Sequence, residues 1–217
     1  MGAITRAAAN NITTGGVILP AGINDASVAS ITALAQVSAG DGITLISSQT
    51  ASASSSLSFT TGIDSSYRTY LFKFINIHPS TNATKFRLIG STNGGSSYGV
   101  ATTTAFFEAL VDETGTYAEV RYENGDDVAQ STSAFPISTN IGNDNDESLS
   151  GFLYLFEPSS STFVKHFLTS TQDGYATYTK TARVGGYFNT TSPINAVQFS
   201  MSSGNIDAGT IYMYGIE

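Results

Sequence analysis

The feature that most constrains the fold is a run of alternating side chains at residues 67–79, YRTYLFKFINIHP. Every second residue in its centre is aromatic, namely Tyr70, Phe72 and Phe74. Because successive side chains of a β-strand point to opposite faces, these three rings share one face, while the other face carries the charged Lys73. The pattern predicts a long strand in the middle of a sheet, with its aromatic face in the core.

Further β-rich runs follow this strand, separated by clusters of Gly, Asn, Ser and Asp that favour turns. They lie at 57–60, 85–89, 105–110, 117–122, 149–156, 163–170, 175–188, 194–201 and 209–216. The run at 105–110 also fits one helical turn, residues 128–146 read as a long loop, and Gly185 and Gly186 suggest a bulge. With nine or ten strands, we expect an all-β fold, an antiparallel two-sheet sandwich of jelly-roll type.

Amino-acid composition argues against two classes of function, nucleic-acid binding and membrane association. The net charge is −8 and only 12% of the 217 residues are charged, with the nine basic residues scattered. A sequence-independent grip on nucleic acid needs clustered Lys and Arg, so we expect no nucleic-acid partner. No apolar run has the length of a signal peptide core or a membrane span, which predicts a protein made in soluble form with no membrane association. The uncharged polar surfaces suit contact with other subunits.

Residues 1–50 differ from the rest, because they lack aromatic residues and carry only three charges. We expect a docking arm and linker at 1–50 and the sandwich at 51–217. The apolar residues of the arm are too few for a core of their own and would bind neighbouring subunits: Val17, Ile18, Leu19, Ile31, Leu34, Ile43, Leu45 and Ile46. A poorly ordered leader is the alternative reading of this segment.

Catalytic and metal signals are weak. The two histidines, His78 and His166, have no recognisable nucleophile motif, and a hydrogen-bonded structural role is the default for both. Seven carboxylates between Glu108 and Asp127 read as a solvated acidic face, although two opposed carboxylates could hydrolyse a glycosidic bond. Residues 143–147 (NDNDE) offer oxygen ligands for calcium but lack the rest of an EF-hand loop. We therefore expect no enzyme activity, no cofactor and no metal.

The eleven tyrosines are the best candidates for contact with a ligand. Four of them lie near turns or among polar neighbours: Tyr98, Tyr175, Tyr178 and Tyr187. Tyrosine rings stack on sugars and also fill protein interfaces, so both uses remain open at these positions.

Several stretches resemble a family of virion structural proteins from tailed bacteriophages, especially aquatic and cyanobacterial ones. The resemblance rests on residues 46–52 (ISSQTAS), 59–67 (FTTGIDSSY), 72–79 (FKFINIHP), 156–167 (FEPSSSTFVKHF), 201–205 (MSSGN) and 209–215 (GTIYMYG). It covers residues 43–217, and its motifs are strand and turn signatures.

The resemblance implies a component of the outer capsid or tail, such as a capsid decoration (cement), head-fibre or tail-fibre protein. Its partners would be the major capsid protein or tail proteins, and it would assemble as a homotrimer. No catalytic residues carry over. A host-surface module that binds polysaccharide is the alternative function, and a polysaccharide depolymerase is a weaker one.

Overall fold

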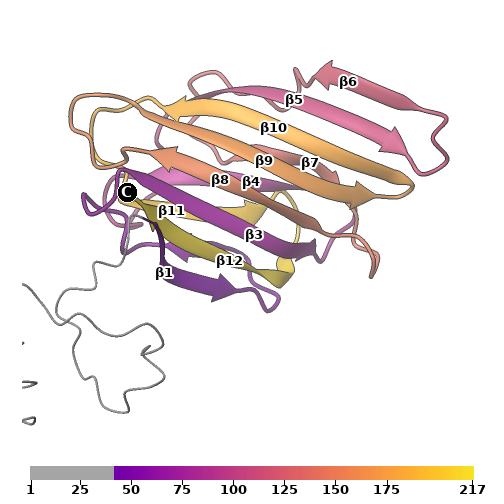
Figure 1. The fold of residues 1–217 in the computed structure, drawn as a ribbon, viewed down its shortest axis with the longest axis horizontal. Coiled ribbons are helices and arrows are strands. Elements are labelled where there is room, and N and C mark those ends of the chain that lie inside the picture. The colour runs from indigo at the N-terminus through magenta and orange to yellow at the C-terminus, as the bar shows by residue number, and fades with distance from the viewer. Residues whose placement is uncertain (1–41) are drawn as a thin grey trace, which may run out of the picture. The chain divides into compact units, whose positions relative to one another are not determined.

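Two antiparallel β-sheets make up the part of the chain that the computed structural model describes, residues 42–217 (Figure 1). The strands are β1 (Ile43–Thr50), β2 (Leu57–Phe59), β3 (Thr69–Pro79), β4 (Thr84–Ser91), β5 (Thr102–Asp112), β6 (Ala118–Tyr122), β7 (Phe135–Ile141), β8 (Leu149–Phe156), β9 (Lys165–Tyr175), β10 (Tyr178–Phe188), β11 (Ala196–Met201) and β12 (Ile206–Ile216). No helix that could span a membrane is found among these residues.

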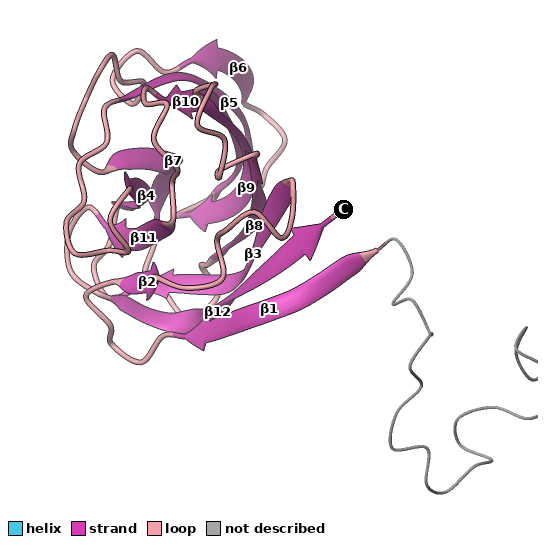
Figure 2. Ribbon diagram, turned by 90° about the vertical axis from the view of Figure 1, so that its left-hand side faces the viewer, coloured by secondary structure: helices cyan, strands magenta, loops and turns pink. Residues whose placement is uncertain are grey.

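The strand order confirms the predicted sandwich of jelly-roll type. The larger sheet runs β1-β12-β3-β8-β9-β10-β5-β6 and the smaller one β2-β11-β4-β7, and Figure 2 shows the two layers edge-on. Successive strands from β1 to β4 alternate between the sheets, as do β7 with β8 and β11 with β12. These eight strands form two matching four-stranded halves, which is the jelly-roll arrangement. Strands β9, β10, β5 and β6 extend one half.

Strand β3 lies in the interior of the larger sheet, paired with β12 on one side and β8 on the other. Its aromatic face is fully buried, as the alternation predicted. Phe72 and Phe74 each contact Phe199 of the opposite sheet, at ring-centroid distances of 5.6 and 5.3 Å. Phe74 also meets Phe86 edge-on at 5.3 Å. Burying such rings removes large apolar areas from water, so these contacts hold the two sheets together.

Three sequence expectations need correction. Residues 43–50, expected in the linker, form β1, which pairs along its length with β12. The expected loop at 128–146 contains a strand, β7, which closes the smaller sheet. Gly185 and Gly186 form no bulge, because β10 keeps a continuous register with both β5 and β9. The described residues thus contain twelve strands rather than nine or ten.

The larger sheet extends beyond the smaller one. Strand β7, the last of the smaller sheet, packs on β9 and β10, so β5 and β6 have no strand opposite their inner face. The connection from β6 to β7 continues along the edge of β5 beyond β6, since Thr104 donates its backbone N–H to the Val128 carbonyl and Thr102 pairs with Ser131. The remaining part of the inner face of β5 and β6, which overhangs the smaller sheet, borders a cavity.

Candidate functional site

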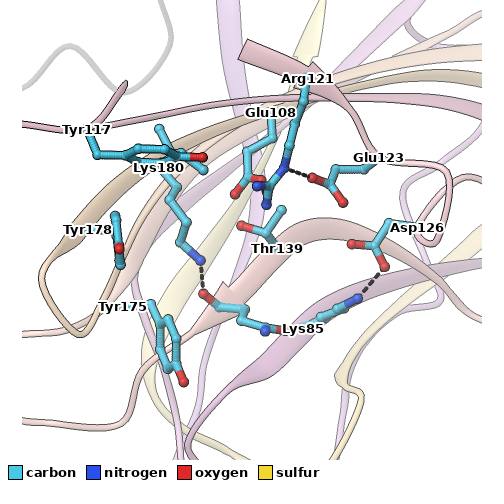
Figure 3. A pocket seen from close by; sticks show the side chains of 12 residues that line it. Lys85, Glu108, Tyr117, Arg121, Glu123, Asp126, Thr139, Tyr175, Tyr178 and Lys180 are labelled. Carbon is cyan, nitrogen blue, oxygen red and sulfur yellow. Dashed lines mark hydrogen bonds and ion pairs between the residues drawn. The ribbon is translucent and has the colours of Figure 1, made fainter. Parts of the chain in front are cut away.

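A cavity of about 400 Å³ lies beneath the overhanging strands β5 and β6, and we call it the overhang pocket (Figure 3). It is lined by Lys85, Glu108, Leu110, Tyr117, Arg121, Glu123, Asp126, Thr139, Asn140, Tyr175, Tyr178 and Lys180. These residues come from strands of both sheets, from the β5–β6 turn and from the start of the β6–β7 connection. A cavity of this size is within the range of small-ligand sites.

Glu108 is the most deeply buried ionisable group of the pocket, with 1% of its surface exposed. Its Oε2 atom lies 2.7 Å from an Arg121 nitrogen, an ion pair without hydrogen-bond geometry. Neither carboxylate oxygen accepts a hydrogen bond from a described residue, and the same is true of the neighbouring Thr139 hydroxyl. Burial raises the pKa of Glu108, and the adjacent Thr139 hydroxyl, followed by the positive charge of Arg121, only partly opposes this.

Arg121 forms ion pairs with several carboxylates at the rim of the overhang pocket. It pairs with Glu123 and, at 3.1 Å, with Glu119, in addition to Glu108. The hydrogen bond to Glu123, followed by the nearby negative charges, raises the pKa of Arg121 further above its ordinary value. A single guanidinium therefore faces three carboxylates on β5, on β6 and just after β6.

Two further ion pairs lie in or beside the overhang pocket. Lys180 lies 3.1 Å from Asp173 and donates to the Asn140 carbonyl oxygen. Both side chains of this pair are almost fully buried, and burial raises the pKa of Asp173 to about 6 despite the adjacent ammonium. Lys85 pairs with Asp126. Each cation of the pocket thus has a carboxylate partner.

Three tyrosines form the opposite side of the pocket. Tyr117 and Tyr178 meet edge-on, with ring centroids 6.4 Å apart, and the Tyr117 hydroxyl donates to Glu119 at 2.7 Å. Lys180 Nζ lies 5.2 Å from the centre of the Tyr175 ring, within the range of a cation–π contact. In Figure 3 the three rings lie across from Glu108 and Thr139.

The four candidate ligand-facing tyrosines do not form one surface. Tyr175 and Tyr178 line the overhang pocket together. Tyr98 borders a separate hollow beside β4, where its hydroxyl is buried. Tyr187 lies on the outside of β10, with its ring 6.1 Å from that of His166.

The residues of the expected assembly arm also differ from one another in their surroundings. Ile43 and Leu45 are exposed on β1, while Ile46 packs against the core. The remaining arm residues, Val17, Ile18, Leu19, Ile31 and Leu34, lie outside the described residues.

Two of the candidate calcium ligands, the Glu147 carboxylate and the Asp144 carbonyl oxygen, already have partners within the protein. Glu147 accepts hydrogen bonds from the backbone N–H groups of Asp144, at 2.9 Å, and Ala176. His78 contacts the Asp144 carbonyl oxygen at 3.2 Å and lies 3.7 Å from Asp207. Within residues 42–217, no three potential ligand side chains gather closely enough to hold a metal ion.

The expectation of a solvated acidic face is wrong for Glu108 and Asp126, which are buried. A signal for Glu108 exists in the sequence, because it alternates with Phe106 and Leu110 and so shares their inward face. Asp173 and Lys180 carry the same signal, since they alternate with buried residues on β9 and β10 and are directly paired in the sheet. Arg121 lies on an exposed edge strand with no comparable pattern.

Comparison of this chain with profiles of protein families, with curated proteins and with solved structures gives no match.

Proposed function

We propose that this protein is a non-enzymatic structural component of a tailed-bacteriophage particle, a capsid decoration or head-fibre protein that assembles as a homotrimer on the outer surface. Its partners would be the capsid or tail proteins to which it attaches. The phage assignment rests on the resemblance at residues 43–217. The observation that carries the assembly role is the outer face of the eight-stranded sheet.

The outer face is defined by two rows of side chains that run across the paired strands. The first row is Leu45, Tyr214, Leu71, Tyr154, Leu168, Gly185 and Ala105. The second is Ser48, Tyr212, Lys73, Phe152, Ser170, Arg183, Phe107 and Tyr122. Phe107 is 51% exposed and Leu168 43% exposed. A broad exposed surface of this kind is typical of a protein interface.

Charge on the outer face favours contact with a differently charged surface. The two rows contain two cations, Lys73 and Arg183, and no carboxylate, although the whole chain has a net charge of −8. Two outer faces pressed together would bring these cations into one interface. Exposed carboxylates such as Glu113 and Asp146 lie elsewhere on the chain. A head-to-tail arrangement of copies, as in a cyclic trimer, therefore fits better than a face-to-face dimer.

Substitution of Leu168 by Glu tests the assembly role. We expect the full chain at about 10 μM to have a trimer mass by light scattering, and Leu168→Glu to be monomeric because it buries an unpaired charge. Phe163→Glu is the matched control, since Phe163 is also exposed and apolar but lies between β8 and β9. A monomeric wild-type chain, or equal behaviour of the two variants, would contradict the assembly role.

The particle assignment is tested on purified phage. An antibody against residues 42–217 with gold labelling, followed by electron microscopy, should place the protein on the capsid or tail surface. Absence of the chain from the mass spectrum of the purified particles would contradict the assignment.

A further inference from the structure

We infer that the overhang pocket binds a neutral, hydroxyl-rich ring, that is, one or two sugar units of a saccharide. The inference does not depend on the role proposed for the outer face. It rests on unpartnered polar atoms inside the pocket, on the internal pairing of its charges and on its tyrosine side.

The unpartnered atoms indicate what kind of group the pocket lacks. Glu108 is buried beside the Arg121 guanidinium and the Thr139 hydroxyl, but neither of them gives it a hydrogen bond of good geometry, and Thr139 Oγ1 has no such bond either. A buried acceptor without a donor is unfavourable, so a ligand that donates a hydrogen bond gains free energy there. The Thr139 hydroxyl can both donate and accept. An alcohol group, which also does both, can satisfy the two protein groups together.

The charges of the pocket argue for a neutral ligand. Lys85, Arg121 and Lys180 are already paired with Asp126, with Glu108, Glu119 and Glu123, and with Asp173. An anionic ligand would have to compete with these carboxylates for their cations, which leaves buried charges uncompensated. A cationic ligand would meet no net negative charge, because the three carboxylates of the lining, Glu108, Glu123 and Asp126, are balanced by the three cations. Neutral hydroxyl groups can bind to the paired charges without separating them.

The tyrosine side supplies an apolar surface for the carbon atoms of a ring. Tyr117 and Tyr178 are 47% and 38% exposed, so part of each aromatic surface is accessible. A sugar ring has an apolar face of C–H groups and a rim of hydroxyl groups, which matches a pocket with tyrosines on one side and carboxylate and hydroxyl acceptors on the other. The volume of about 400 Å³ accommodates one or two such rings.

Saturation-transfer NMR on the full chain tests this inference. The probes are the methyl pyranosides of glucose, galactose and mannose, N-acetylglucosamine, glucuronate as an anion and tetramethylammonium as a cation, each at about 10 mM, where even weak binding is visible. We expect transfer to at least one neutral sugar. Tyr178→Ala and Glu108→Gln should each weaken its binding about tenfold or more, a change of about 1.4 kcal/mol. Phe163→Ala, an exposed aromatic residue that lies outside both the pocket and the outer face, is the control and should bind as the wild type does.

Three outcomes would overturn the inference: no transfer to any neutral sugar, binding of the charged probes alone, or equal loss in Tyr178→Ala and Phe163→Ala. Thermal unfolding of each variant shows whether it is folded. If Glu108→Gln does not fold, the comparison of Tyr178→Ala with Phe163→Ala decides, because both side chains are exposed and their truncation leaves the core intact.

Discussion

At the scale of single residues, burial decides what an ion pair contributes. Arg121 faces the fully buried carboxylate of Glu108, whereas Arg68 pairs with Glu157 where both side chains are exposed. Removal of one partner from a buried pair leaves an uncompensated charge, but an exposed pair contributes little. Because the Arg121 side chain is itself 42% exposed, solvent screens part of the charge left on Glu108. We expect Arg121→Met to lower the free energy of unfolding by about 1–3 kcal/mol and Arg68→Met by less than about 1 kcal/mol. Urea denaturation measures both, and equal losses would show that Glu108 is not held by Arg121.

Asp173 makes the free energy of unfolding depend on pH, and the direction of this dependence follows from its pKa. Its pKa rises from an ordinary value of 3.8 to about 6 on burial, so between these values the folded state holds a proton that the unfolded state has released. The unfolding free energy should therefore fall as pH rises from 4 to 6, by up to about 3 kcal/mol from this group. In Asp173→Asn this part of the decrease should vanish, and the change in slope is measured by denaturation at several pH values. An unchanged slope would exclude Asp173 as its source.

Asp112 makes stability depend on pH in the opposite direction. Hydrogen bonds from Thr114, then from the Tyr117 backbone N–H, lower its pKa from 3.8 to about 2. Its stabilising contribution is therefore present above pH 4 and is lost as the pH falls toward 2. Because the two effects occur in different pH ranges, Asp112 does not mask the contribution of Asp173.

At the scale of elements, close packing between strands fixes where glycine is required. A Cβ atom on Gly151 of β8 would lie 2.3 Å from the Ser170 carbonyl oxygen and 2.8 Å from the Thr171 Cα atom of β9. Backbone of a central strand cannot move aside cheaply, so we expect Gly151→Ala to lower the unfolding free energy by about 1–3 kcal/mol. Gly125→Ala is the control, because a Cβ there meets no atom within 4 Å. Calorimetry should show a lower melting temperature for Gly151→Ala alone; equal temperatures would mean that β8 and β9 separate easily.

At the scale of the whole molecule, the unequal sizes of the sheets place two surfaces in one fold. Four extra strands widen the larger sheet, and the same extension creates both the overhang pocket on its inner side and much of the outer face on the other. Strand β5 contributes to both, with Glu108 directed inward and Phe107 outward. A particle protein with this arrangement could bind its neighbours through one side of the sheet and a saccharide beneath the other.

The sequence alone determined the fold class and most strands, because alternation and turn residues are local signals. The run at 149–156 coincides with β8, and the aromatic face of β3 is buried as expected. Strand β7 was missed because Pro136 and the polar residues Ser138 and Thr139 interrupt its pattern. The Ser138 hydroxyl is buried where it accepts a hydrogen bond from the Phe86 N–H of β4, and Thr139 is buried beside the overhang pocket, so both depend on segments distant in the sequence.

Only the tertiary structure decided which charged residues are buried together. Glu108, Asp126 and Lys180 come from three separate segments, and no local pattern shows that they line one pocket. The pairing of β1 with β12 likewise joins the beginning of the described chain to its end. The physical reason is the same in both cases: alternation fixes the direction of each side chain relative to its own strand, whereas burial depends on which strands lie opposite.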